Sequence, residues 1–148
     1  MLESCGFRPV YKNGYKSFQT LNDIEIEPIN SLEGAELYNH LKNIFPKTNR
    51  PKYILTVGLS FSEDLTVIQQ NSDIVRKNVT AMVSYILKEI NSEKIILKDA
   101  FFRTSSFSVT YYPYSNVTQK HEILKNLAEL CAESIRNKII LHIEKSPI

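Results

Sequence analysis

The sequence has few of the residues that identify the most distinctive classes of protein. It contains two cysteines, Cys5 and Cys131, and three histidines among 148 residues. A disulfide framework needs a larger cysteine set, and a zinc site needs Cys or His at close spacing. Only four glycines are present, and none forms a glycine-rich phosphate loop. We therefore expect no disulfide scaffold, and no metal or cofactor.

Strong charge and long apolar runs are also missing. The formal net charge is +2 and the pI is about 8.5, whereas nucleic-acid-binding domains usually have a pI above about 9 and a clustered basic face. The apolar runs "KIILKDAFF" and "NKIILHI" are short and contain charges, and a transmembrane helix needs about 18 apolar residues. The composition is that of an ordinary globular domain, and the length predicts a single one.

The first part of the chain predicts a short strand followed by a helix. Apolar and polar residues alternate from Asp23 to Glu27, which is typical of a strand with one apolar face. Asn30 followed three residues later by Glu33 has the spacing of a capping box. The apolar stripe after it predicts a helix over Leu32–Phe45, which ends because the residue before Pro46 is biased away from helical geometry.

Three long strands are predicted next, joined by the turn sequences "QNSD" and "NSEK". They cover residues 53–70, 75–90 and 95–112, and the polar middle of the third predicts a bulge or bend. The first two strands alternate between an apolar face and a small, polar one. The apolar positions are Tyr53, Leu55, Val57, Leu59 and Phe61 in the first strand, and Val79, Ala81, Val83, Tyr85 and Leu87 in the second.

A long helix is predicted at the end of the chain, capped by Ser115 or Asn116. Its apolar stripe places Cys131 in the core, together with Ile123, Leu124, Leu127, Ile135 and Ile139. The element order is β-α-β-β-β-α. The predicted fold class is therefore α+β: a two-layer sandwich of about four mostly antiparallel strands with two helices on one face.

No group of residues suggests catalysis. "GLSF", Gly58–Phe61, lacks the second glycine of a nucleophile elbow, and "HEILK" has Lys125 where a zinc-binding helix needs a second histidine. Glu25 and Glu27 share a strand face and are better explained as solvated residues than as an acid–base pair. His40 and His142 are better explained as polar-face residues than as ligands. We do not expect an enzyme.

Two binding hypotheses remain open from the residues alone. The aromatic stretch "FFRTSSFSVTYY" invites comparison with RNA-binding sheets, in which strand aromatics stack on bases, although those sheets have the order β-α-β-β-α-β. Alternatively, Arg76, Lys77, Lys88 and Arg103 could place cations on or beside the sheet to meet phosphates of a lipid. The ordinary explanation of these cations is edge-strand charge that discourages aggregation.

The stretch "CGFRPVY", Cys5–Tyr11, resembles the mature N-terminus of the LPS-assembly lipoproteins (LptE), especially the alphaproteobacterial type. The element order agrees with that family from Cys5 to about Ile143. The resemblance implies an outer-membrane lipoprotein that faces the periplasm and is acylated at Cys5. It implies a plug inside the β-barrel LptD, whose assembly it assists, and a part in exporting lipopolysaccharide. Arg76, Lys77 and Arg103 would be the candidate lipopolysaccharide contacts. No nucleic-acid partner is expected on this reading.

On this reading residues 1–22 form the lipid-attachment segment and tether, and residues 23–148 form a single α+β domain. Only Met1–Ser4 precede Cys5, and these four residues contain neither the basic nor the apolar stretch of a secretion signal. Three explanations stay open: the signal is missing from this sequence, the start is misassigned, or the chain is not exported.

Overall fold

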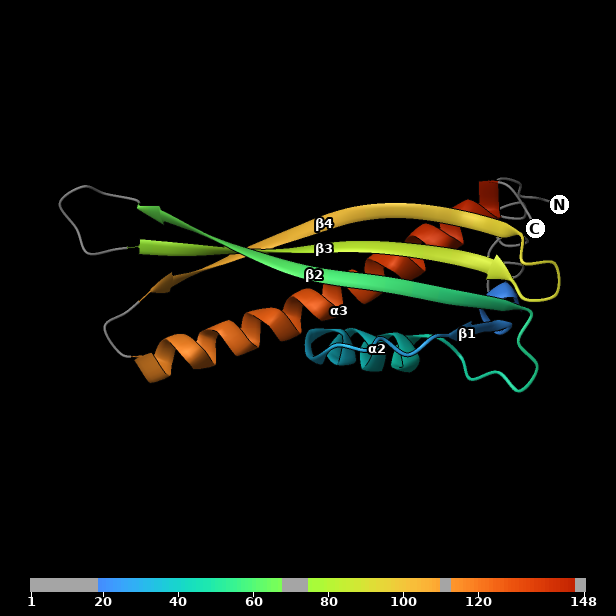
Figure 1. Ribbon diagram of the computed structural model, residues 1–148, viewed down its shortest axis with the longest axis horizontal. Helices are drawn as coiled ribbons and strands as arrows, with labels where there is room; N and C mark the ends of the chain where they lie inside the picture. Colours follow the sequence, from blue (N-terminus) through green and yellow to red (C-terminus); the bar gives the residue numbers. More distant parts are fainter. Residues whose placement is uncertain (1–18, 68–74, 110–112, 146–148) are drawn as a thin grey trace, which may run out of the picture.

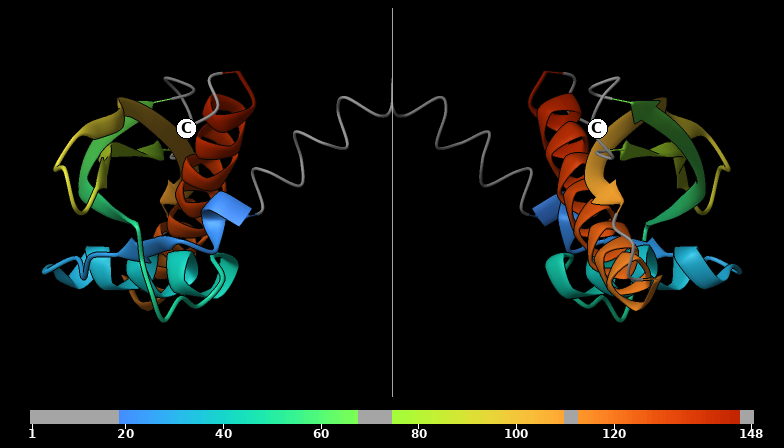
Figure 2. Two further views of the ribbon diagram at one scale, coloured as in Figure 1. Left: turned by 90° about the vertical axis from the view of Figure 1, so that its right-hand side faces the viewer. Right: turned by 90° about the vertical axis from the view of Figure 1, so that its left-hand side faces the viewer.

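The computed structural model describes residues 19–67, 75–109 and 113–145 (Figure 1). The predicted acylation site Cys5 lies outside them. The element order is β1 (Ile24–Ile26), α2 (Leu32–Ile44), β2 (Tyr53–Val67), β3 (Val75–Glu89), β4 (Ile95–Val109) and α3 (Pro113–Lys145). This confirms the predicted fold class. Figure 2 shows the sheet as one layer, with α2 and α3 on the same side of it.

The sheet is a β2–β3–β4 meander with the short strand β1 added at one edge. The strands lie in the order β1-β2-β3-β4. β1 is parallel to β2, and the other two pairings are antiparallel. The predicted irregularity in β4 exists, but it lies near the start of the strand, where the register shifts opposite Leu87 and Lys88, and not in the polar middle.

The start of α2 differs by one residue from the predicted capping box. Ser31, not Asn30, is the N-cap, and its Oγ accepts a hydrogen bond from the Gly34 backbone N–H at 2.9 Å. The N3 position is therefore Gly34 rather than Glu33, so the Asn30–Glu33 box does not form. α2 ends at Ile44 because Phe45, the residue before Pro46, adopts an extended conformation with ψ 139°.

The helix α3 begins earlier than predicted. It starts at Pro113, two residues before the predicted cap at Ser115. Proline suits a first helical turn because the missing backbone N–H would have no partner there, and its fixed φ is helical. The predicted apolar stripe is confirmed, since Leu127, Cys131, Ile135 and Ile139 are all fully buried.

The core lies between the sheet and the helices, and the period-2 pattern decides which strand residues enter it. All five predicted inward positions of β3 are buried, and so are Leu55 and Val57 of β2. Leu59 and Phe61 are partly buried against this core. Leu21 is also buried. The predicted boundary between tether and domain after residue 22 stays a prediction.

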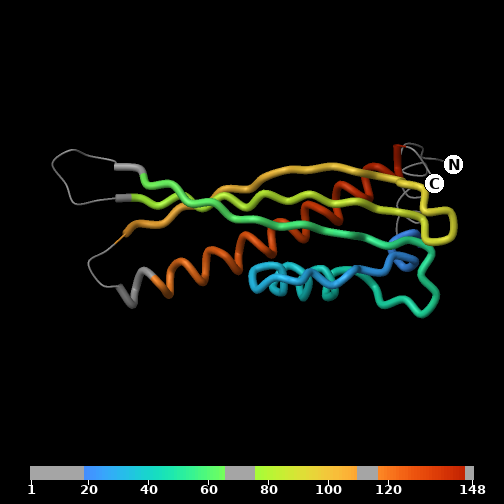
Figure 3. Tube along the Cα trace, viewed as in Figure 1, coloured from blue at the N-terminus to red at the C-terminus, as the bar shows by residue number. Residues whose placement is uncertain are grey.

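The two helices cover different parts of the sheet. α3 packs on β3 and β4, α2 packs on β1 and β2, and the helices pack on each other. The three long strands each have 15 residues and α3 has 33, so strands and helix are each about 50 Å long. α2, with 13 residues, spans only about 20 Å. Figure 3 shows α3 running the length of the molecule, while α2 lies beside only part of it.

Candidate interaction surfaces

The face of the sheet that points away from the helices has no covering layer in the described part of the chain (Figure 2). We call it the outer face. Its centre consists of three cross-strand rows without a charged residue: Ser62–Thr80–Thr104, Ser60–Met82–Phe102 and Gly58–Ser84–Ala100. Its small and polar residues confirm the predicted polar side of the strands.

Two large apolar side chains stand on this otherwise small-residue face. Met82 is 56% exposed and Phe102 is 66% exposed, and they are direct cross-strand partners. Beside them the row Gly58–Ser84–Ala100 forms the floor of two adjoining hollows of about 480 and about 620 Å³. The outer face therefore carries a raised apolar pair next to a hollow. The sequence shows that Met82 and Ser84 share a face, but the alignment with β4 depends on the register.

The three predicted phosphate contacts do not lie together. Arg76 is on the outer face, exposed, and its Nη2 donates to Ser106 Oγ at 3.2 Å. Lys77 and Arg103 lie on the helix-facing side, where Lys77 is opposite Phe107 and Arg103 is opposite Ala81. A single phosphate site made of all three residues is therefore not formed within the described structure.

Lys77 belongs to a small ion cluster around Glu63. The Lys77 Nζ lies 3.1 Å from one carboxylate oxygen of Glu63, and the Lys120 Nζ of α3 lies 2.7 Å from the other. The hydrogen bond from Lys120, followed by that from Lys77, lowers the pKa of the Glu63 carboxyl below its ordinary value. Glu63 thus joins β3, through Lys77, and the first part of α3, through Lys120.

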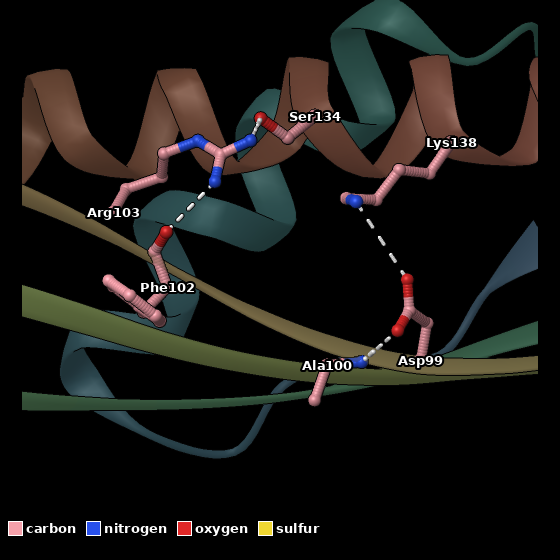
Figure 4. A network of polar contacts seen from close by, with 6 residues as sticks. All are labelled: Asp99, Ala100, Phe102, Arg103, Ser134 and Lys138. Carbon is pink, nitrogen blue, oxygen red and sulfur yellow. Dashed lines mark hydrogen bonds and ion pairs between the residues drawn. The ribbon is translucent and has the colours of Figure 1, made fainter.

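Arg103 connects the edge strand β4 to α3 (Figure 4). Its Nη2 donates to Ser134 Oγ at 3.1 Å and its Nη1 donates to the Phe102 carbonyl at 2.8 Å. The guanidinium carbon lies 4.9 Å from the centre of the Phe101 ring, within cation–π range. These contacts give Arg103 a structural role in the described chain, whether or not it also meets a phosphate.

A second cation, which sequence reasoning missed, lies beside the same ring. The Lys138 Nζ is 5.4 Å from the centre of the Phe101 ring and 3.8 Å from the Asp99 carboxylate. Asp99 also accepts a hydrogen bond from the Ala100 backbone N–H at 2.8 Å (Figure 4). Lys138 was invisible as a candidate because it is one of several lysines on the polar side of a helix, and only the packing angle of α3 brings it to β4.

The buried titratable groups of the core are poor nucleophiles. Burial raises the pKa of the Cys131 thiol to about 11. Burial, and then the nearby Asp99 charge, also raises the pKa of the Tyr85 hydroxyl. The Tyr85 hydroxyl has no hydrogen bond of good geometry within the described residues, although it lies near Asp99. Both side chains therefore remain protonated at neutral pH.

Metal binding and membrane crossing by a helix find no support in the described structure. Residues 19–67, 75–109 and 113–145 contain no group of three or more His, Cys, Asp or Glu side chains that could hold a metal ion. None of the helices in these ranges is long and apolar enough to cross a membrane.

Comparison with curated proteins identifies one family. The chain is 32% identical over 142 residues to the uncharacterized protein RP188 of Rickettsia prowazekii, an alignment that covers 96% of this chain and 90% of the relative. This chain belongs to the RP188 family. No established family model matches the sequence. The RP188 relationship extends over almost the whole chain, so both proteins are expected to share the complete α+β sandwich.

Three solved structures share the fold at low identity. A Caulobacter crescentus CB15 protein provisionally named a lipoprotein aligns with a TM-score of 0.69 and 13% identity over 86% of this chain and 96% of its own. The rare lipoprotein B of Shewanella oneidensis aligns with a TM-score of 0.60 and 6% identity. The alignment covers 79% of this chain and 91% of that protein. The minor lipoprotein of Acinetobacter baumannii aligns with a TM-score of 0.53 and 12% identity. The alignment covers 80% of this chain and 88% of that protein. The RP188-family chain thus has a fold that also occurs in proteins named lipoproteins.

Proposed function

We propose that this chain is an outer-membrane lipoprotein of the LPS-assembly type. On this proposal it is anchored through Cys5, faces the periplasm, plugs the β-barrel LptD, assists the assembly of that barrel and takes part in lipopolysaccharide export. The observation that carries the proposal is the likeness of 79–86% of the chain to three structures named as lipoproteins. The stretch "CGFRPVY", which resembles the family's mature N-terminus, supports it independently.

The surface of the sandwich suits a protein that works by filling a space. The lumen of a large membrane barrel is lined by polar side chains. The outer face offers serine and threonine hydroxyls and a charge-free centre, and its deepest features are shallow hollows. Such a surface favours binding over chemical turnover, and on this proposal the chain is not an enzyme.

The RNA-binding alternative loses support from the arrangement of β4. A base-stacking sheet needs several exposed aromatics on one face. Phe101 and Phe107 face the helices and pack with the core, so Phe102 is the one aromatic among the described residues of β4 on the outer face. A single aromatic among small polar residues is a weak platform for bases.

The anchor is tested by the chemical state of Cys5. The protein is expressed from its native gene with the upstream DNA, and its N-terminal peptide is analysed by mass spectrometry. We expect an acylated Cys5 in the membrane fraction, and loss of both the modification and the membrane association in Cys5→Ser. Cys131→Ala is the matched control, because Cys131 is buried and should not affect anchoring. An unmodified Cys5 in the native host would contradict the proposal.

The partner is tested by co-purification from detergent-solubilised membranes. We expect the tagged chain to retain a large β-barrel protein after stringent washing, and the Cys5→Ser variant to retain less because it is no longer held at the membrane. Recovery of the anchored chain without any barrel would remove the plug role while leaving the lipoprotein assignment intact.

The lipid contacts are tested by charge reversal, read by binding to purified lipopolysaccharide. Arg76→Glu is the cleanest variant, because its one described contact is a hydrogen bond to Ser106 on the exposed face. Lys77→Glu and Arg103→Glu also break contacts with Glu63 and Ser134, so their folding must be checked by thermal unfolding. Unchanged binding by folded variants would dismiss these residues as phosphate contacts.

A further inference from the structure

The strand β2 has one edge that is mostly unpaired. β1 pairs only with Tyr53–Leu55, and Figure 1 shows β2 continuing well past β1 and past the start of α2. β3 occupies the other edge of β2 along its whole length. Within the described residues, no strand pairs with the β1 side of β2 after Leu55. We call the part of this side over Phe61–Leu65 the open edge.

The alternation of β2 shows which backbone groups lie at the open edge. The Leu55 carbonyl accepts a hydrogen bond from the Glu27 N–H on the β1 side. The register of β2 against β3 continues without a shift, so every second residue after Leu55 points its N–H and C=O the same way. Phe61, Glu63 and Leu65 therefore direct these groups away from β3, and the residues between them bond to β3.

The opposite edge of the sheet is protected by its own side chains. On β4 the Ala100 N–H donates to the Asp99 carboxylate, and the Phe102 carbonyl accepts from Arg103. The alternation continues across β3, so Ala100 and Phe102 point these groups away from β3. Occupied groups of this kind discourage pairing with another chain. In the part of the chain that the structure describes, no side chain bonds to the backbone of the open edge.

A hollow beside the open edge can receive a side chain of an added strand. Its volume is about 190 Å³, and its apolar lining consists of Leu32, Phe61 and Leu124. Leu32 is 93% exposed and Leu65 is 67% exposed. A residue paired with Phe61 points to the same side of the sheet as Phe61, toward this hollow. A residue paired with Leu65 covers Leu65 in the same way.

We propose that the open edge of β2 binds an extended segment of a partner protein as a further strand of the sheet. In strand addition, main-chain hydrogen bonds give affinity and pockets for alternate side chains give specificity. The open edge offers the first and the hollow offers the second. The segment carries apolar residues opposite Phe61 and Leu65. This proposal goes beyond the proposed function and does not depend on it.

The charges at the open edge define the other side of the bound segment. Asp64 is exposed and points to the outer face, opposite in direction to its neighbours Glu63 and Leu65. A basic residue opposite Asp64 forms a favourable cross-strand pair. The rim of the hollow has both signs, because Glu33 of α2 and Lys125 of α3 both line it. The partner segment therefore alternates apolar residues on its inner side with basic residues on its outer side.

A second copy of this chain fits the open edge poorly. Symmetric antiparallel pairing centred on Glu63, the middle residue of the edge, places two Glu63 carboxylates directly opposite each other, which is destabilising. Lys77 and Lys120 already hold the carboxylate of Glu63. A neutral residue opposite Glu63 therefore suits this position better than another carboxylate.

Hydrogen exchange measured by NMR on the full chain tests the added strand. The probe is a short synthetic peptide in which leucine alternates with lysine, and the control peptide has the same composition in two blocks. We expect the alternating peptide to protect the amides of Phe61, Glu63 and Leu65. The amides of Ser62 and Asp64 are bonded to β3 before the peptide is added. The block peptide should bind about tenfold more weakly, because it cannot place leucines on one side.

Two substitutions test the contacts separately. Leu65→Pro removes an N–H that points out of the sheet, where proline is tolerated, and should weaken binding of the alternating peptide about tenfold. Ser108→Pro is the matched control, since the Ser108 N–H points out of the sheet at the β4 edge. Thermal unfolding checks that both variants are folded. Leu32→Ser changes an exposed side chain of the hollow and should also weaken binding, whether or not Leu65→Pro folds.

The outcomes separate this proposal from its alternatives. No binding at millimolar peptide would overturn it, and so would binding that protects β4 or leaves the open edge unprotected. Protection of the open edge in the concentrated chain without peptide would assign the edge to a second copy instead. The plug role is decided independently, because the peptide can bind the open edge even when no barrel co-purifies, and a barrel can be recovered while the open edge stays unprotected.

Discussion

The two faces of the same sheet differ completely, although each strand contributes alternate residues to both. On β3 the inward residues Val83, Tyr85 and Leu87 are almost fully buried, while their neighbours Met82 and Ser84 are exposed. The inner face is constrained by packing against two helices. No element of the described chain covers the outer face, so its composition is set by solvent and by partners. Residues that contact other molecules are therefore expected on the outer face, which does not pack against the helices.

The strongest test of this difference removes one large apolar side chain from each face of β3. Leu87→Ala should lower the free energy of unfolding by about 2–5 kcal/mol because it leaves a cavity in a packed core. Met82→Ala should change it by no more than about 0.5 kcal/mol, as is usual for exposed sites. Urea unfolding of the two variants measures both effects. Equal losses would show that the outer face is also packed in the free protein.

Glycines on the two layers give a second test. A Cβ at Gly34 would collide with the Ile29 and Ser31 side chains at the start of α2, so Gly34→Ala should cost about 1–3 kcal/mol. A Cβ at Gly58 on the outer face would lie 3.0 Å from the Ser84 hydroxyl, which can rotate away. Gly58→Ala should therefore stay within about 0.5 kcal/mol of the parent. The thermal midpoints of the two variants measure these losses of stability. A Gly34→Ala protein as stable as the parent would contradict the close packing at the start of α2.

The inner face is not entirely apolar. The polar contacts between β4 and α3 show how much such contacts contribute to the stability of the fold. A double-mutant cycle on Arg103→Ala and Ser134→Ala should give a coupling free energy of about 0.5–1.5 kcal/mol, the net value of a hydrogen bond. Lys125→Ala on the exposed side of α3 serves as the uncoupled reference. Additive effects of Arg103 and Ser134 would show that the side-chain hydrogen bond contributes little to holding α3.

The smallest expected effect is on the stability of the fold at acid pH. The folded pKa of Glu63 is lowered by Lys120 and Lys77, so its contribution is complete above the ordinary value of 4.5 and is lost as pH falls through the lower folded pKa. The contribution should stay below about 1 kcal/mol, because these side chains are partly exposed. Glu63→Gln should flatten the fall in stability below pH 4.5. Parallel curves for parent and Glu63→Gln would show no benefit from the ion cluster.

Much of the fold could be predicted because it follows from short-range pattern. The alternation in β2 and β3 predicts their inner faces correctly, and the apolar spacing in α3 predicts its buried stripe. The errors occurred at the two helix starts and at the irregularity of β4, which lies opposite Leu87 and Lys88 and not in the polar middle. Ser31 and Asn30 are both good caps, and the choice depends on the packing of Ile29 and Gly34. The predicted cap at Ser115 or Asn116 lies inside α3, because Pro113 already suits the first turn of a helix.

The candidate surfaces could be predicted only in part, because they depend on contacts between distant segments. Arg76 and Lys77 are adjacent in sequence and for that reason lie on opposite faces of β3. The Phe102–Met82 pair and the hollow beside it exist only in the observed register of β3 and β4. Lys138 reaches Asp99 through the crossing angle of α3, which no local pattern encodes.

The shortness of α2 has a consequence for motion. Among the described residues, two helices cover the strands at the end of the sheet near β1, whereas only α3 covers the opposite end (Figure 3). Segments with fewer buried contacts open locally at lower free energy. Backbone amides of β3 near Lys77 should therefore exchange with solvent deuterium sooner than those near Leu87. Protection from hydrogen exchange should therefore change along the length of β3. The change should be steepest where the first turn of α2 begins.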